Sequence, residues 1–280
     1  MTLRLSSRIL LISLAALTLS CAGCASKKGE DAAAAIESHA PVGEMYNEAA
    51  GKLDADKYTE AATSFDAVEQ NYPYSQWAAR AQLMAAYSSY RNLKYDEALD
   101  ALNRFIELHP SDDNVAYAYY LRAVCYYEQI TDVRRDQEMT ERALDALKQV
   151  KTRFPDTKYA RDASLKIDLT YDHLAGKEME IGRYYLGRKQ YQAAINRFNR
   201  VVEQYQMSAA VPEALHRLTE AYLSLGIRQE ALKTAAILGQ NYPDSRWYKD
   251  TYKFAGLIAG EKAETKDPTL YDKTLGRVFN

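Results

Sequence analysis

Few residues of this chain are spaced in a way that could support catalysis. Its four histidines are scattered along the sequence, at His39, His109, His173 and His216. None belongs to the H-E-x-x-H pattern that binds a catalytic zinc, and the sequence lacks both the G-x-S-x-G turn of serine hydrolases and a phosphate-binding P-loop. A cell-wall hydrolase would lack its nucleophile here. We therefore expect a protein that is not an enzyme and uses no cofactor.

One cluster of acidic residues has the composition of a metal site. Asp132, Asp136 and Glu138 stand beside Arg134 and Arg135. Because the two guanidinium groups can pair with these carboxylates, the segment is more typical of a salt-bridged loop that orders an insertion. We therefore expect no metal centre.

The start of the chain is typical of a secretory signal peptide, predicted here over residues 1–23. Arg4 and Arg8 form a basic region, and residues 9–19 form an apolar run that small residues follow. No later stretch approaches the roughly 18 uninterrupted apolar residues that indicate a membrane-spanning helix.

Lipid attachment is the one chemical modification that the cysteines predict. Small residues precede Cys24, as in a bacterial lipobox, where the cysteine is diacylated and becomes the new N-terminus. Cys21 matches that pattern less well, and ordinary secretion with cleavage near Ala25 is the alternative. Fatty chains such as palmitate would then anchor the protein, since each buried CH₂ contributes about 0.8 kcal/mol. Ala25, rather than Asp, follows Cys24, which in such lipoproteins favours sorting to the outer membrane.

The third cysteine, Cys125, lies in a Tyr-rich stretch that reads as helical. If Cys24 is acylated, Cys125 is the remaining thiol of the mature chain, and no disulfide can form within it. We expect it to be a buried small hydrophobe.

A recurring spacing of alanines and prolines predicts the helices of the rest of the chain. Five alanines each stand twelve residues before the end of a helix-like stretch: Ala61, Ala98, Ala143, Ala194 and Ala231. The residues at those ends are Pro73, Pro110, Pro155, Gln206 and Pro243, and an aromatic ring precedes each. A large apolar residue follows the first four alanines by four positions, on the same helix face. Each unit is thus a helical hairpin that must stack on its neighbours.

The spacing of these units is irregular. The alanines are 37, 45, 51 and 37 residues apart, against about 34 in the tetratricopeptide repeat that the pattern resembles. The second gap predicts an insertion in the polar run 131–138. The third gap contains no proline over residues 158–187, which predicts one unusually long helix there. Polar residues after each end are expected to cap the next helix: Ser75, Asp112, Thr157, Ser208 and Ser245.

These signals predict an all-α fold, a right-handed superhelical array of five tetratricopeptide-like helical hairpins. An acylated N-terminus and flexible linker are expected at 24–43, and a polar C-terminal tail at 262–280. The repeats occupy 44–261, as approximately 44–75, 76–112, 113–157, 158–208 and 209–245, then a final helix.

A peptide-binding groove is predicted from the first helix of each hairpin, which lines the concave face of tetratricopeptide arrays. Counting back from the alanines places nine residues on that face: Tyr46, Arg80, Leu83, Tyr87, Tyr90, Arg91, Tyr117, Tyr120 and Tyr127. Rings with occasional Arg suit an extended peptide with apolar and aromatic side chains and a free carboxylate or acidic residue. Packing between repeats is the alternative role for about half of these tyrosines.

The charge of the chain argues against a nucleic-acid partner. It carries 38 acidic and 36 basic residues, a formal net charge of −2. Loss of Arg4 and Arg8 with the signal peptide makes the mature chain more acidic. Without a basic block, no patch is available to neutralise phosphates.

Several local motifs occur in a fixed order along the chain. They are FIELHP at 105–110, AYAYYLR at 116–122, Arg135-Asp136, RFPDTKYA at 153–160, the stretch 180–191 with Tyr184-Tyr185, AINRF at 194–198 and EAL at 213–215. With the lipobox and the repeats, these motifs resemble the BamD (ComL) family, lipoproteins of the outer-membrane β-barrel assembly machine. The resemblance covers residues 24 to about 250. The chain departs from the family pattern at Gln206 and in the tail from about Lys262.

The resemblance implies a scaffold on the periplasmic side of the outer membrane. The C-terminal repeats would dock the periplasmic domains of the barrel-forming insertase subunit, alongside other lipoproteins of the machine. The N-terminal repeats would receive unfolded outer-membrane protein precursors. Arg197 matches a family arginine implicated in the subunit contact; an exposed helix-surface charge is the alternative. A repeat lipoprotein for pilus or secretin assembly, or for envelope constriction, is the alternative function.

Overall fold

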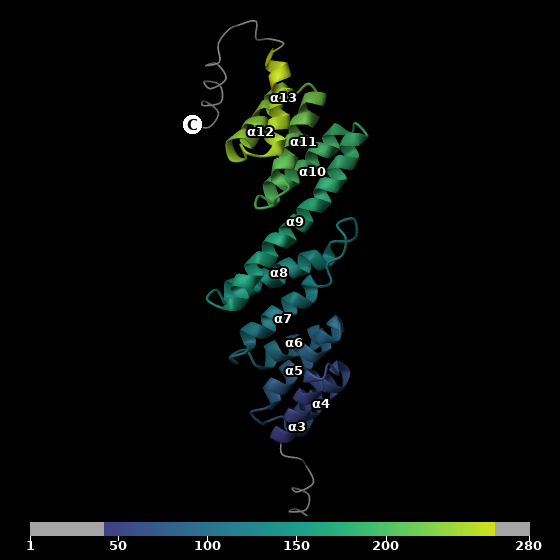
Figure 1. The fold of residues 1–280 in the computed structure, drawn as a ribbon, viewed down its shortest axis with the longest axis vertical. Helices are drawn as coiled ribbons and strands as arrows, with labels where there is room; N and C mark the ends of the chain where they lie inside the picture. The colour runs from purple at the N-terminus through teal and green to yellow at the C-terminus, as the bar shows by residue number, and fades with distance from the viewer. Residues whose placement is uncertain (1–41, 261–280) are drawn as a thin grey trace, which may run out of the picture. The chain divides into compact units, whose positions relative to one another are not determined.

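The computed structural model describes residues 42–260, and over that range it consists of helices joined by short connections (Figure 1). The helices are α3 (Val42–Asp54), α4 (Tyr58–Asn71), α5 (Ala78–Arg91), α6 (Tyr95–Leu108), α7 (Val115–Tyr127), α8 (Glu138–Arg153), α9 (Lys158–Gly187), α10 (Tyr191–Gln204), α11 (Val211–Ser224), α12 (Arg228–Asn241) and α13 (Arg246–Gly260). The predicted all-α fold of helical hairpins is confirmed. The helix α3 begins at Val42, inside the predicted linker. The signal peptide, Cys24 and the tail lie outside the described residues.

The chain divides into two compact units, one ending at Ser88 and the other beginning at Ser89. In the first unit, α3 and α4 form a hairpin that packs with the first turns of α5 around Phe65. In the second unit, consecutive helices from α6 to α12 pack on one another, and α13 covers α11 and α12. The second unit therefore contains the elements on which most of the predicted site residues lie.

The five anchoring alanines lie on the second helix of each hairpin and are almost completely buried, at 0 or 1% exposure. The large residues four positions later are also buried in the first four hairpins: Phe65, Leu102, Leu147 and Phe198. A small residue lets two helices approach closely, and the large residue one turn later fills the space between them. The predicted packing of the hairpins is confirmed.

The aromatic residue before each predicted helix end is the C-cap. Tyr72, His109, Phe154 and Tyr242 all have φ between −126° and −136°, and each donates its backbone N–H to the carbonyl four residues earlier. A following proline disfavours helical backbone at this position. However, Tyr205 adopts the same conformation, with φ −124°, although Gln206 follows it. The helix end therefore does not depend on the proline ring alone.

Of the five polar residues expected to cap the following helix, Thr157 is the N-cap of its helix, with its Oγ1 accepting from the Ala160 N–H at 3.2 Å. Ser245 directly precedes α13, and its Oγ accepts the Trp247 N–H at 3.2 Å, so it also caps its helix. Asp112 and Ser208 instead accept the N–H two residues later, inside the turn before the helix, and the Ser75 hydroxyl is buried without a hydrogen-bond partner. The prediction is wrong for Ser75, Asp112 and Ser208, because a short turn separates each of them from the helix. Asn114 and Ala210 occupy the N-cap positions after Asp112 and Ser208.

The long helix predicted over 158–187 is confirmed as α9, a helix of 30 residues. Its first half packs along α8 and its second half along α10 (Figure 1). In the second half, Gly182 faces the Phe198 ring, and a Cβ at that glycine would overlap the ring. The glycine therefore sets how closely α9 and α10 approach each other.

The predicted insertion is the connection between α7 and α8. The α9 residue Lys177 donates to the backbone carbonyls of Arg134 and Arg135, at 2.8 and 3.2 Å. The Arg134 guanidinium also lies 3.7 Å from the Glu180 carboxylate. The loop is thus held by α9, and within the loop the Asp132 carboxylate also accepts the Arg134 backbone N–H at 2.8 Å.

Candidate functional site

Four tyrosines form an aromatic wall on the second unit: Tyr117, Tyr120 and Tyr127 of α7, and Tyr159 of α9. The Tyr159 ring centroid lies 5.5 Å from that of Tyr117 and 5.2 Å from that of Tyr120. All four side chains are partly exposed. Because α7 and α9 pack together, these rings present both apolar faces and phenol groups at the surface.

A charged network lies beside these rings. The Tyr120 hydroxyl donates to Asp162 Oδ2 at 2.6 Å, and the Lys166 ammonium donates to the same oxygen at 2.8 Å. Lys166 also lies 5.5 Å from the centroid of the Tyr127 ring. The network therefore connects the tyrosines of α7 to the charged residues of α9.

The network fixes the protonation of its members. Hydrogen bonds from Lys166 and Tyr120 lower the pKa of Asp162, because both donors stabilise its charged form. Burial, and then the bond to Asp162, strongly raise the pKa of Tyr120. At neutral pH, Asp162 is thus a carboxylate and Tyr120 a neutral phenol that donates a hydrogen bond.

The predicted residues Tyr90 and Arg91 are also in the second unit. The Tyr90 ring lies 6.1 Å from that of Tyr95, and Tyr90 adds to the rise in the pKa of Tyr120. Arg91 is exposed at the last position of α5. For Tyr90 and Arg91 the role in binding stays a prediction.

The other four predicted groove residues belong to the first unit. Tyr46 and Leu83 are buried, at 7 and 4% exposure, and the Tyr46 ring packs against Phe65 and Trp77. Arg80 is exposed and lies 5.4 Å from the Tyr46 ring centroid, and Tyr87 is partly exposed. Tyr46 and Leu83 are therefore core side chains, which a peptide could not reach without repacking; for Arg80 and Tyr87 the role in binding stays a prediction.

Arg197 lies on α10 and is held by α9. Its guanidinium donates to Glu178 at 3.1 Å, and Arg200 shares the same carboxylate at 3.3 Å. The side chains of Arg197 and Arg200 are 31 and 52% exposed, whereas that of Glu178 is 12% exposed. Two guanidinium groups thus share the one Glu178 carboxylate, and both remain partly exposed.

Comparison with known proteins identifies the family. The family described as "YfiO: Outer membrane lipoprotein" matches residues 38–238. The outer membrane protein assembly factor BamD of Caulobacter vibrioides is 47% identical over 84% of this chain and 76% of its own length. The BamD of Rickettsia prowazekii is 47% identical over 87% of this chain and 95% of its own. The chain belongs to the BamD family.

Membership confirms the resemblance drawn from the sequence motifs. BamD relatives carry the name of assembly factors and not of enzymes, which agrees with the prediction of a non-catalytic protein. A solved tetratricopeptide-repeat protein of Thermus thermophilus is 20% identical, with a TM-score of 0.38, over 78% of this chain and all of that one. That likeness has no bearing on function.

Within residues 42–260, no helix is both long and apolar enough to span a membrane. Over the same residues, no three His, Cys, Asp or Glu side chains converge as metal ligands. Cys125 is fully buried, and burial raises the pKa of its thiol to about 12. The prediction that this cysteine packs as a small hydrophobe is confirmed, since a thiol that stays protonated is a poor nucleophile.

Three residues of the wall and its network were not among the predicted site residues: Tyr159, Asp162 and Lys166. They lie on α9, the first helix of the fourth hairpin. The count from the alanine anchors covered the first three hairpins and did not extend into this long helix. The signal was nevertheless present, because Lys158, Asp162 and Lys166 recur at four-residue spacing and must share one helix face.

Proposed function

We propose that this BamD-family chain is a lipid-anchored scaffold of the outer-membrane β-barrel assembly machinery. Family membership supports this role over pilus or secretin assembly and over envelope constriction. The scaffold docks the periplasmic domains of a barrel-forming insertase subunit and works beside other lipoproteins of the machine. It receives unfolded outer-membrane protein precursors and performs no bond chemistry on them.

The aromatic wall is the surface that receives the precursor. Its tyrosines are only partly buried, so their rings are available to a ligand. Because α7 and α9 pack together, the helices that carry these rings are already ordered, and binding loses little conformational entropy. Segments of outer-membrane barrels alternate apolar and polar side chains. An extended segment of this kind can place alternate side chains on the rings while its backbone stays accessible to polar groups. This exposed set of rings is the observation that carries the proposal.

A peptide titration tests the wall. Replacing Tyr117 and Tyr159 by Ala together is expected to weaken binding of a fluorescent peptide from a barrel C-terminus by about tenfold or more, because buried aromatic contacts dominate such interfaces. Tyr184→Ala is the matched control, since Tyr184 is a 55% exposed tyrosine near the other end of α9. Equal affinity of the double variant and the control would place the binding site elsewhere.

The C-terminal repeats dock the insertase subunit through the surface of Arg197. The partly exposed guanidinium groups of Arg197 and Arg200, which share the Glu178 carboxylate, suit an acidic group on the partner. Arg197→Ala should reduce co-purification of the barrel-forming subunit. Arg200→Ala removes a bond to the same carboxylate and serves as the control. If both variants lose the partner equally, the ion-pair cluster as a whole matters and Arg197 has no separate role.

Cys24 carries the lipid anchor in this proposal and lies outside the described residues. Cys24→Ala should release the protein from outer-membrane fractions into the soluble periplasm. Cys21→Ala is the control and should leave it bound. If Cys24→Ala stays in the membrane fraction and Cys21→Ala is released, the acylated residue is Cys21.

A further inference from the structure

We propose that Asp162 anchors the main chain of the bound peptide, with Oδ1 accepting a hydrogen bond from a backbone N–H. The inference rests on the proposed function, because it concerns the peptide that the aromatic wall receives. It adds a polar binding residue whose hydrogen bond does not depend on the side chains of the peptide.

The geometry of the carboxylate supports this role. Both intramolecular donors, Tyr120 and Lys166, bind the same oxygen, Oδ2. Among the described residues, no donor reaches Oδ1, and the Asp162 side chain is 41% exposed. Tyr120 and Lys166 therefore fix the orientation of the carboxylate while one of its oxygens stays open to a ligand.

The setting of this oxygen favours a neutral donor over a basic side chain. Lys158 and Lys166 stand four residues before and after Asp162 on α9, so both share its helix face. The Lys158 ammonium lies 5.3 Å from the Tyr159 ring centroid. Because the Lys166 ammonium already pairs with this carboxylate, it would compete with and repel an incoming Lys or Arg, whereas an amide N–H meets no such repulsion.

An N–H donor also fits the shape of an extended peptide. Such a chain rises about 3.3 Å per residue, and its side chains alternate between two faces. Its N–H groups point sideways, between those faces. A peptide can thus donate one N–H to Asp162 while its apolar side chains contact Tyr117 and Tyr159. Because every non-proline residue carries this donor, the anchor can hold many different precursor sequences.

The test combines backbone-methylated peptides with variants of Asp162. The probe is a fluorescent decapeptide with aromatic residues at alternate positions, together with copies that each carry one N-methylated backbone amide. Binding is measured to the full-length lipidated protein in detergent. One N-methyl position should weaken binding to the wild type by about tenfold, as expected for a hydrogen bond to a charged acceptor.

Asp162→Ala should bind the unmethylated peptide about tenfold more weakly and should no longer distinguish it from that methylated copy. Asp162→Asn keeps an acceptor oxygen, so it should lose less affinity and still distinguish the two peptides. Tyr120→Phe keeps Oδ1 and should also retain the discrimination. Circular dichroism and thermal unfolding of each variant show whether it is folded.

The possible results separate the two proposals. If Tyr159→Ala weakens binding but Asp162→Ala binds like the wild type, the main-chain anchor is overturned and the aromatic wall stands. The anchor is also overturned if the effects of methylation and Asp162→Ala simply add. A third result would also overturn it: Asp162→Asn loses as much affinity as Asp162→Ala, and binding requires a Lys in the peptide. Asp162 would then pair with that Lys side chain and not with the main chain. If the decapeptide binds wild type and the Tyr117, Tyr159 double variant equally, the proposed site fails and the anchor fails with it.

Discussion

Along α9, the half from Lys158 to Thr170 presents rings and charged groups at the surface, whereas the half from Met179 to Gly187 packs closely against α10. Leu165 and Leu169 in the first half are 66 and 56% exposed. Met179 in the second half is 1% exposed, and Gly182 meets the Phe198 ring. One continuous helix thus carries a partly exposed face near its start and contributes to a packed core near its end.

The difference follows from which residues face the neighbouring helices. In the first half, the partly exposed Tyr159 ring contacts Tyr120 of α7, and the ionised pair of Asp162 and Lys166 stays partly exposed beside them. In the second half, Gly182 allows close contact with α10 and Met179 is buried in the shared core, although Tyr184 remains exposed. Substitutions at the buried Met179 and Gly182 of the second half should therefore change folding stability, and substitutions at exposed residues of the first half should mainly change binding.

The largest effect is expected for Phe198→Ala. Phe198 is fully buried in the core shared by α9, α10 and α11. Its removal leaves a cavity, and such changes cost about 3–5 kcal/mol of unfolding free energy. Urea unfolding followed by circular dichroism measures the loss. Leu165→Ala, at an exposed leucine on α9, should change stability by less than about 0.5 kcal/mol. A similar cost for both would remove the contrast between the two halves.

A smaller effect is expected for Gly182→Ala, because its new methyl group would overlap the Phe198 ring. Overpacking of this kind costs about 1–3 kcal/mol. At Gly187, a Cβ would meet no atom within 4 Å, so Gly187→Ala should be neutral or stabilise the helix by up to about 1 kcal/mol.

The contact can be isolated by combining the two substitutions. In a Phe198→Ala background the ring is absent, so adding Gly182→Ala should cost nothing further. Unfolding midpoints of the four proteins give the coupling free energy. Strict additivity would show that the glycine is needed for something other than approach to Phe198.

The sequence predicted the length of α9 and the α10 residues that pack against it better than it predicted the surface formed by the first half of α9. Ala194 and Phe198 lie four residues apart, and this spacing alone places both in a hairpin core. The absence of proline over 158–187 predicted the length of α9, since few other signals break a helix. These features depend on local periodicity, which a sequence displays directly.

The candidate site depends on pairing between helices that are distant in sequence. Tyr120 and Asp162 meet only because α7 packs on α9, and a count along one hairpin cannot show that contact. Tyr46 illustrates the opposite error, because its spacing is right for a groove but its ring is enclosed by Phe65 and Trp77. Tyrosine serves equally well in a core and on a surface, so residue type does not decide between them.

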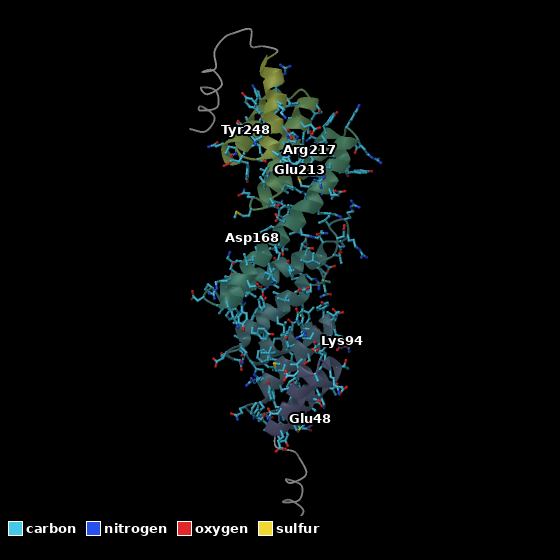
Figure 2. The ribbon with its side chains drawn as sticks, in the orientation of Figure 1. Glu48, Lys94, Asp168, Glu213, Arg217 and Tyr248 are labelled. Atoms are coloured by element: carbon cyan, nitrogen blue, oxygen red, sulfur yellow. The ribbon has the colours of Figure 1, made fainter. Side chains whose placement is uncertain are left out.

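The smallest effect is expected in the dependence of stability on acid pH, and it concerns Asp162 in the first half of α9. Lys166 and Tyr120 lower the pKa of Asp162 in the folded protein, and unfolding returns it to about 3.9. The stability from this group is therefore present above about pH 4 and is lost as the pH falls through the folded value. Asp162→Asn should reduce the difference in urea midpoint between pH 5 and pH 3. Asp168→Asn, at an exposed carboxylate of the same helix (Figure 2), is the control. If both variants keep the wild-type difference, the network does not hold Asp162 in its charged form, and the first half of α9 presents only its rings.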